Sequence, residues 1–117
     1  MSGARSRRKG RAWEQAVARM LRPLFGDAVK RGWQARSGKD APDVVGTPYH
    51  IECKHGALVN LRAALKQAIE ATDGRVPLVV AKDNRSEPLV VMRLSDWLKL
   101  EEERLPKVVA AELKDGE

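Results

Sequence analysis

Two acidic residues and a lysine lie close together in the middle of the chain: Asp43, Glu52 and Lys54. Side chains alternate faces along a β-strand, so Glu52 and Lys54 share one face and Cys53 points to the other. A hairpin over 42–54 brings Asp43, on the preceding strand, alongside Glu52. Two carboxylates held this close raise each other's pKa unless a cation lies between them, and oxygen ligands suit Mg²⁺ or Mn²⁺.

This group of residues predicts a metal-dependent hydrolase that cuts phosphodiesters. A divalent ion bound by Asp43 and Glu52 would lower the pKa of a bound water and stabilise charge on the leaving oxygen. The backbone carbonyl of Cys53 is a further candidate ligand, and Lys54 is suited to orienting the water and the phosphate. The expected cofactor is Mg²⁺, for which Mn²⁺ can substitute. A plain ion pair on a solvent-facing strand is the alternative reading of Glu52 and Lys54.

The rest of the chain must supply a sheet and helices that hold these residues. Apolar residues at helical spacing predict a helix over 11–24, which Gly26 ends. The other expected elements are a strand over 28–35, the hairpin over 42–54, a helix from an Asn60 cap to about 72, strands over 77–81 and 88–92, and a last helix capped by Ser95 and running to about Glu103. The order α-β-β-β-α-β-β-α predicts an α/β domain with a mixed central β-sheet flanked by helices.

Length and composition predict a single small domain. A chain of 117 residues with 43% hydrophobic residues can bury one core. We expect residues 1–10 to form a flexible basic arm, 11–104 the domain and 105–117 a tail. Cys53 is the only cysteine, so no internal disulfide can form and a reducing compartment is expected. No apolar stretch reaches the length of a signal-peptide core or a membrane span, which predicts a cytoplasmic protein of a prokaryotic cell or a phage that does not contact membranes.

The charge of the chain indicates a partner. The net charge is +6, and the excess of Lys and Arg is concentrated in residues 1–36. Concentrated positive charge attracts phosphate polymers and releases their counterions, so DNA is the expected partner, with a merely solubilising surface as the alternative. The candidate DNA contacts are Arg5, Arg7, Arg8, Lys9, Arg11, Arg36, Lys39 and His55.

The sequence Pro42-Asp43 followed by Glu52-Cys53-Lys54 resembles the motif of the PD-(D/E)XK nuclease superfamily. A closer likeness, over residues 9 to about 100, is to the archaeal-type Holliday junction resolvases, with Lys9-Gly10 before Glu14 and Arg36-Ser37-Gly38 before Pro42. This resemblance implies a restriction-endonuclease-like core and metal-dependent cleavage of DNA. It also implies that Glu14 is a catalytic acid near the metal, that Ser37 contacts a phosphate and that Gln67 is an accessory catalytic group. The segment 55–60 departs from the resolvase pattern, which leaves the substrate open.

The leading interpretation is a structure-selective endonuclease that resolves four-way junctions as a homodimer, because a two-fold dimer presents two matching sites to two strands. The apolar runs 77–81 and 88–92 and the last helix are candidates for the dimer interface. Two alternatives stay open. One is a restriction-like, nicking or phage DNA-processing nuclease that acts on duplex or branched DNA. The other is a non-cleaving DNA-binding module of the same fold.

Overall fold

The computed structural model describes residues 2–32 and 41–105, and for residues 2–6 the backbone alone. Five strands form one sheet in the order β1-β2-β3-β4-β5. They are β1 (Lys30–Arg31), β2 (Val44–Val45), β3 (Tyr49–His55), β4 (Val76–Lys82) and β5 (Leu89–Val91). The pair β3–β4 is parallel and the other three pairs are antiparallel, so the predicted mixed sheet and the predicted order of elements are confirmed.

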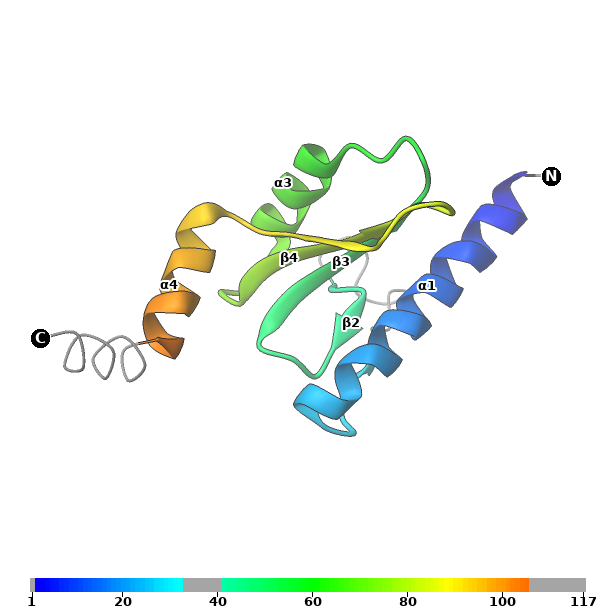
Figure 1. The fold of residues 1–117 in the computed structure, drawn as a ribbon. Helices are drawn as coiled ribbons and strands as arrows, with labels where there is room; N and C mark the ends of the chain where they lie inside the picture. The colour runs from blue at the N-terminus through cyan, green and yellow to red at the C-terminus, as the bar shows by residue number, and fades with distance from the viewer. Residues whose placement is uncertain (1, 33–40, 106–117) are drawn as a thin grey trace, which may run out of the picture.

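Helices cover both faces of the central strands (Figure 1). Helix α1 (Ser2–Phe25) packs Trp13 and Val17 against a core that includes Ile51 on β3. Helix α3 (Leu61–Ala71) packs Ala64 on the other face, against alternate residues of β4. Strand β3 is therefore buried on both sides, including the face that carries His50 and Glu52.

The first helix is longer than the sequence predicted. It begins at Ser2 rather than at residue 11, so the segment expected to be a flexible arm is the first part of α1. The apolar stripe that predicted the helix begins only at Trp13, because Arg7, Arg8, Lys9 and Arg11 before it are basic and exposed. Basic residues are good helix formers, and a helix that is already anchored propagates easily into such a segment.

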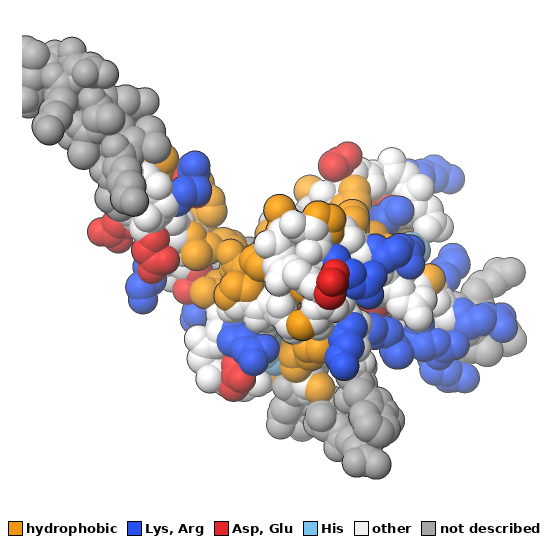
Figure 2. All heavy atoms as spheres, turned by 90° about the horizontal axis from the view of Figure 1, so that it is seen from below, with side chains coloured by type: hydrophobic (Ala, Val, Ile, Leu, Met, Phe, Trp, Pro, Cys, Tyr) orange, Lys and Arg blue, Asp and Glu red, His pale blue; other side chains and the backbone are white. Residues whose placement is uncertain are grey.

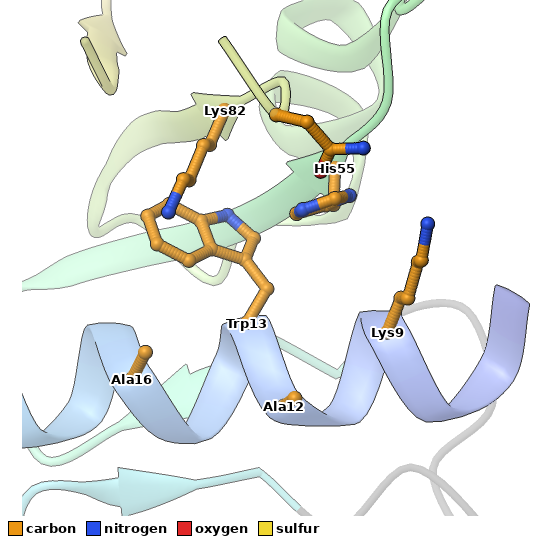
Figure 3. Close-up of a pocket in the computed structure, with 7 residues that line it drawn as sticks. Lys9, Ala12, Trp13, Ala16, His55 and Lys82 are labelled. Carbon is orange, nitrogen blue, oxygen red and sulfur yellow. The ribbon is translucent and has the colours of Figure 1, made fainter. Parts of the chain in front are cut away.

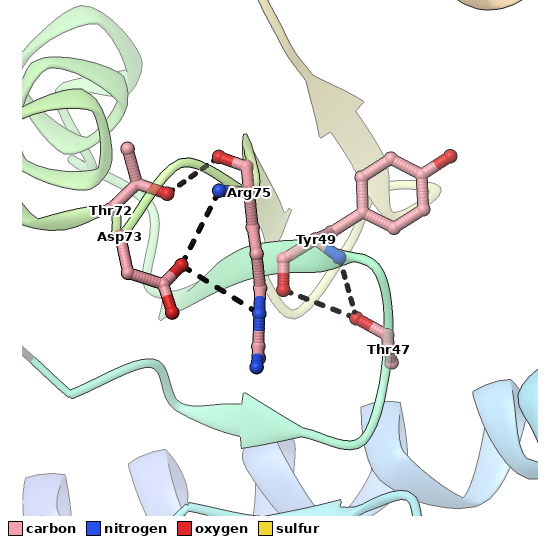
Figure 4. A network of polar contacts seen from close by, with 5 residues as sticks. All are labelled: Thr47, Tyr49, Thr72, Asp73 and Arg75. Carbon is pink, nitrogen blue, oxygen red and sulfur yellow. Dashed lines mark hydrogen bonds and ion pairs between the residues drawn. The ribbon is translucent and has the colours of Figure 1, made fainter.

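The predicted hairpin over 42–54 is confirmed, with β2 and β3 antiparallel and Val44 opposite Ile51. Its turn contains Gly46 at a φ of +90°, where an added Cβ would lie 2.6 Å from the carbonyl oxygen of Ala28. The hydroxyl of Thr47 accepts a hydrogen bond from the Tyr49 N–H at 3.0 Å and donates to the Tyr49 carbonyl at 3.2 Å (Figure 4). The turn is thus closed by a side chain as well as by backbone geometry.

The crossover from β3 to β4 is fixed at both ends of α3. The Asn60 side chain accepts a hydrogen bond from the Ala63 N–H at 3.0 Å, which confirms the predicted cap. At the other end the Thr72 hydroxyl donates to the Arg75 carbonyl at 2.5 Å, and Asp73 lies 3.7 Å from the Arg75 guanidinium (Figure 4). In the parallel pair that this crossover joins, Glu52 lies opposite Val79.

Two boundaries near the ends of the sheet differ from the sequence prediction. Strand β1 covers only Lys30–Arg31 of the predicted strand over 28–35, and residues 33–35 lie outside the described segments. Helix α4 (Leu94–Arg104) has Arg93 as its N-cap, so the prediction that Ser95 caps it is wrong. Ser95 lies inside the first turn, which is closed instead by an Arg93–Asp96 ion pair at 2.8 Å. Within the described segments, no helix is both long enough and apolar enough to cross a bilayer.

Candidate functional site

Asp43, the residue just before β2, lies alongside Glu52 on β3, as the hairpin predicts. The Asp43 N–H donates to the Ile51 carbonyl at 2.7 Å, and the Asp43 carboxylate accepts from the Cys53 N–H at 2.8 Å. These two bonds hold Asp43 against the neighbouring strand. Asp43 is only 7% exposed and Glu52 only 5%, so both carboxyl groups are largely withdrawn from water.

Burial changes the acidity of both groups. Desolvation raises the pKa of Asp43 to about 6, against the lowering effect of its hydrogen bond from Cys53. Desolvation also raises the pKa of Glu52 to about 7, and the negative charge of Asp43 raises it further while Lys54 lowers it. A cation between the two carboxylates would remove this mutual repulsion, so the pair is an electrostatically favourable place for one.

Lys54 lies next to Glu52 and is the more exposed of the two. Its ammonium lies 3.8 Å from the Glu52 carboxylate and donates to the side-chain oxygen of Gln67 at 3.4 Å. The Lys54 side chain is 33% exposed. Gln67, on α3, was predicted as an accessory group from the resemblance, and the structure brings it into contact with the lysine. Glu52 and Lys54 share one face of β3, which is the arrangement that strand alternation predicts.

Glu14 reaches the site from α1. Its negative charge raises the pKa of both Asp43 and Glu52, which places it within electrostatic range of the two carboxylates. Its own carboxylate is paired with the Arg31 guanidinium at 2.6 Å. Sequence reasoning missed Arg31, counting it only as part of the basic excess. The pair joins α1 to β1. The only signal in the sequence was the alternation of faces along a strand at Lys30–Arg31, which indicates the face on which the Arg31 side chain lies.

The donor set fits a hard divalent cation that keeps part of its water shell. In the two described segments, no three His, Cys, Asp or Glu side chains come together closely enough to hold an ion. Mg²⁺ is commonly bound through one or two carboxylates together with water and substrate oxygens, so Asp43 and Glu52 suffice. The Cys53 thiol is buried on the opposite face of β3 from Glu52, and desolvation raises its pKa. That its backbone carbonyl is a ligand stays a prediction.

The basic candidates lie mainly along α1. The side chains of this helix are described from residue 7 onward, and its first basic ones are all exposed: Arg7, Arg8, Lys9 and Arg11. Figure 2 shows most of the blue Lys and Arg side chains gathered on the side of the molecule away from α4. The side chain of Arg5, and the predicted contacts Arg36, Ser37 and Lys39, lie outside the described part of the chain. His55, the last residue of β3, lines a hollow beside α1.

Comparison with protein-family models, with curated proteins and with solved structures gave no match to this chain. The chemistry of its functional groups must therefore carry the functional assignment.

Proposed function

We propose that the chain is a Mg²⁺-dependent DNA endonuclease of the PD-(D/E)XK type, with Asp43, Glu52 and Lys54 as its cutting site. The observation that carries the proposal is a pair of buried carboxylates with raised pKa values beside a lysine ammonium on the same strand face. Burying two acids together destabilises a fold unless they bind something in return. This combination is unusual on a purely structural strand and suits metal-dependent hydrolysis of a phosphodiester.

Each residue of the site has a role in this proposal. Asp43 and Glu52 would hold Mg²⁺, which would supply an activated water and neutralise charge on the phosphate. The Lys54 ammonium donates to the attacking water or to a non-bridging phosphate oxygen, and its charge opposes the negative charge that develops there. Gln67 accepts from Lys54 and fixes the direction of the ammonium. Glu14 completes the acidic side of the site, and Arg31 holds it in place.

DNA is the proposed substrate because the protein is basic. The chain carries a net charge of +6, and α1, which packs on the Ile51 face of β3, presents exposed arginines to solvent. Such side chains bind phosphates irrespective of base sequence, as a structure-selective enzyme requires. Within this proposal the substrate is a four-way junction, cut by a homodimer whose two sites match the two-fold symmetry of the junction.

The test is incubation of the protein with labelled four-way junction, duplex and single strand, each with Mg²⁺ and with EDTA. We expect paired, symmetric nicks near the crossover of the junction, in Mg²⁺ only, and no cleavage by Asp43→Asn. Cleavage of plain duplex at a similar rate would favour a restriction-like or nicking nuclease over a resolvase. Absence of metal-dependent product on every substrate, with DNA binding intact, would leave a non-cleaving DNA-binding module and overturn the nuclease proposal.

A further inference from the structure

A hollow of about 240 Å³ lies between α1 and the ends of the two parallel strands, outside the carboxylate site. Lys9 borders it from α1, and His55 and Lys82 border it from the last positions of β3 and β4 (Figure 3). Asn84, just beyond β4, adds an amide. None of the described residues that line it is acidic. The polar side chains that line the hollow are therefore hydrogen-bond donors, and none of them carries a negative charge.

The fold brings these side chains together from distant parts of the sequence. Lys9 lies one helical turn before Trp13, on the same side of α1. In the register of the parallel pair, His55 lies opposite Lys82, so the two side chains stand next to each other at the end of the sheet. Asp83, the next residue along the chain, accepts from the Arg85 N–H at 2.8 Å and from the Ser86 hydroxyl within its own loop. These hydrogen bonds lower the pKa of its carboxyl, and the nearby charge of His55 lowers it further.

The floor of the hollow excludes a stacked base. Trp13 is only 6% exposed, and its indole N–H donates to the Val80 carbonyl at 3.1 Å. The Lys82 ammonium lies 5.4 Å from the centre of the indole ring, and the His55 ring meets it edge-on with 6.4 Å between centroids. The aromatic surface is thus already covered by a cation and an imidazole. The volume is also below the range of typical pockets for drug-sized ligands, so the hollow suits a compact anion.

We propose that this hollow binds a DNA backbone phosphate other than the one that is cut. This inference rests on the proposed function, since it places a second phosphate beside the same site. Along β3, His55 follows Glu52 by three positions, which is roughly 10 Å at the rise of a strand. A backbone whose scissile phosphate lies at Glu52 and Lys54 can therefore reach the hollow within a few nucleotides. Because Lys54 and His55 point to opposite faces, the backbone crosses the end of the strand between the two contacts.

The inference is tested by DNA affinity in EDTA, where cleavage plays no part. Fluorescence anisotropy with labelled junction over a series of salt concentrations would compare the native protein with Lys9→Gln and Lys82→Gln. Each variant should bind several-fold more weakly, and the slope of log affinity against log salt should fall by about 0.9 for each ion pair lost. Lys82→Arg should keep the affinity, and Lys99→Gln, an exposed lysine of α4, should bind like the native protein. Lys9 is exposed, so its variant should fold like the native protein and separates loss of binding from loss of folding.

The outcomes distinguish this inference from the proposed function. Native-like affinity and salt slope in both Lys9→Gln and Lys82→Gln would overturn the phosphate subsite, even if the protein cuts DNA. Weakened binding in both variants would support the subsite, even if no cleavage is found on any substrate. NMR signals of the His55 ring that shift with inorganic phosphate, but not with DNA, would show a small-anion site and also overturn the proposal.

Discussion

The carboxyl groups of Asp43 and Glu52 are stabilised in their neutral forms by burial, and their pKa values rise to about 6 and about 7. In the unfolded chain both groups return to the ordinary values of exposed acids. At pH values above these shifted pKa values, the folded protein must hold two ionised carboxylates in a poorly hydrated position. A bound cation would therefore stabilise the folded protein at these pH values. Functional sites often lower the stability of a fold in this way.

The sign of the pH dependence follows from these raised values. Between about pH 4 and pH 7 the unfolded chain releases the Glu52 proton before the folded chain does, so the stability of the metal-free protein falls as pH rises. We expect Glu52→Gln to remove the part of this loss that Glu52 causes, while the part that Asp43 causes remains. The variant should be more stable than the native protein at pH 8, by on the order of 2 kcal/mol. Urea unfolding in EDTA at pH 4 and pH 8 measures it.

Glu70→Gln, which changes an exposed glutamate of α3, is the matched control and should unfold like the native protein at both pH values. Adding Mg²⁺ at pH 8 should stabilise the native protein and leave Glu52→Gln unchanged, because an ion bound only to the folded state stabilises it. Equal free energies of unfolding for the native protein and Glu52→Gln at pH 8 would mean that ionisation of Glu52 does not destabilise the fold.

The sequence was informative about these residues because strand alternation is a strong rule. It predicted that Glu52 and Lys54 share a face, that Cys53 turns away, and that the hairpin delivers Asp43. It could not predict the Glu14–Arg31 pair, since that contact depends on how α1 lies across β1. Nor did it predict that α3 buries the Glu52 face, because an isolated strand pattern does not tell which face a later helix covers.

The helices and strands position the site through the short β2–β3 hairpin and through β4, which pairs with β3. Every strand and helix over the described segments was predicted in type and order, because apolar periodicity and Gly or Pro punctuation mark them clearly. The boundaries were less predictable. The start of α1 depends on helix propagation beyond its packed face, and the start of α4 depends on the Arg93–Asp96 ion pair instead of a hydroxyl cap.

The turn at Gly46 offers a test of how tightly the hairpin is held. An Ala side chain at Gly46 would need a φ of +90° and would also meet the Ala28 backbone at 2.6 Å. Gly74 has a comparable φ of +112° but open space around it. We expect Gly74→Ala to cost about 1 kcal/mol from backbone conformation alone, and Gly46→Ala to cost at least about 2 kcal/mol more.

Chemical denaturation of the two variants gives both values directly. Gly46→Ala should also lose metal-dependent stabilisation, because a displaced turn moves Asp43 away from Glu52. Equal costs for the two variants would show that the turn can move without disturbing the sheet.

At the scale of the whole molecule, charge and apolar surface are partly separated. Basic side chains gather along α1, whereas α4 extends beyond the sheet with none of its residues buried (Figure 1). Many exposed large apolar residues lie on β5 and α4: Leu89, Val90, Leu94, Trp97 and Leu98. Others lie at the end of α1, at Met20, Leu24 and Phe25, and at Leu58 before α3. A helix with no buried face is not stabilised by packing within one copy of the chain. The apolar surface of β5 and α4 is the place where the proposed homodimer would form, away from the DNA-binding side.

The dimer is tested by light scattering coupled to size exclusion at micromolar concentration. We expect the native protein to elute with twice the mass of one chain, and Leu98→Glu to elute as a folded monomer, since a charge in an apolar interface is costly. Lys99→Glu, the next residue on the same helix, is the matched control and should stay dimeric. A monomeric native protein would contradict the proposed homodimer, and the proposed cutting site within one chain would be unaffected.

Single-turnover cleavage of a labelled four-way junction in Mg²⁺ measures whether Asp43, Glu52 and Lys54 form a cutting site. We expect a fall in rate of at least about a hundredfold for Glu52→Gln and for Lys54→Met, with junction binding retained, and a native rate for Glu70→Gln. A native rate in either site variant, or no Mg²⁺-dependent cleavage by the native protein, would contradict the proposed cutting site.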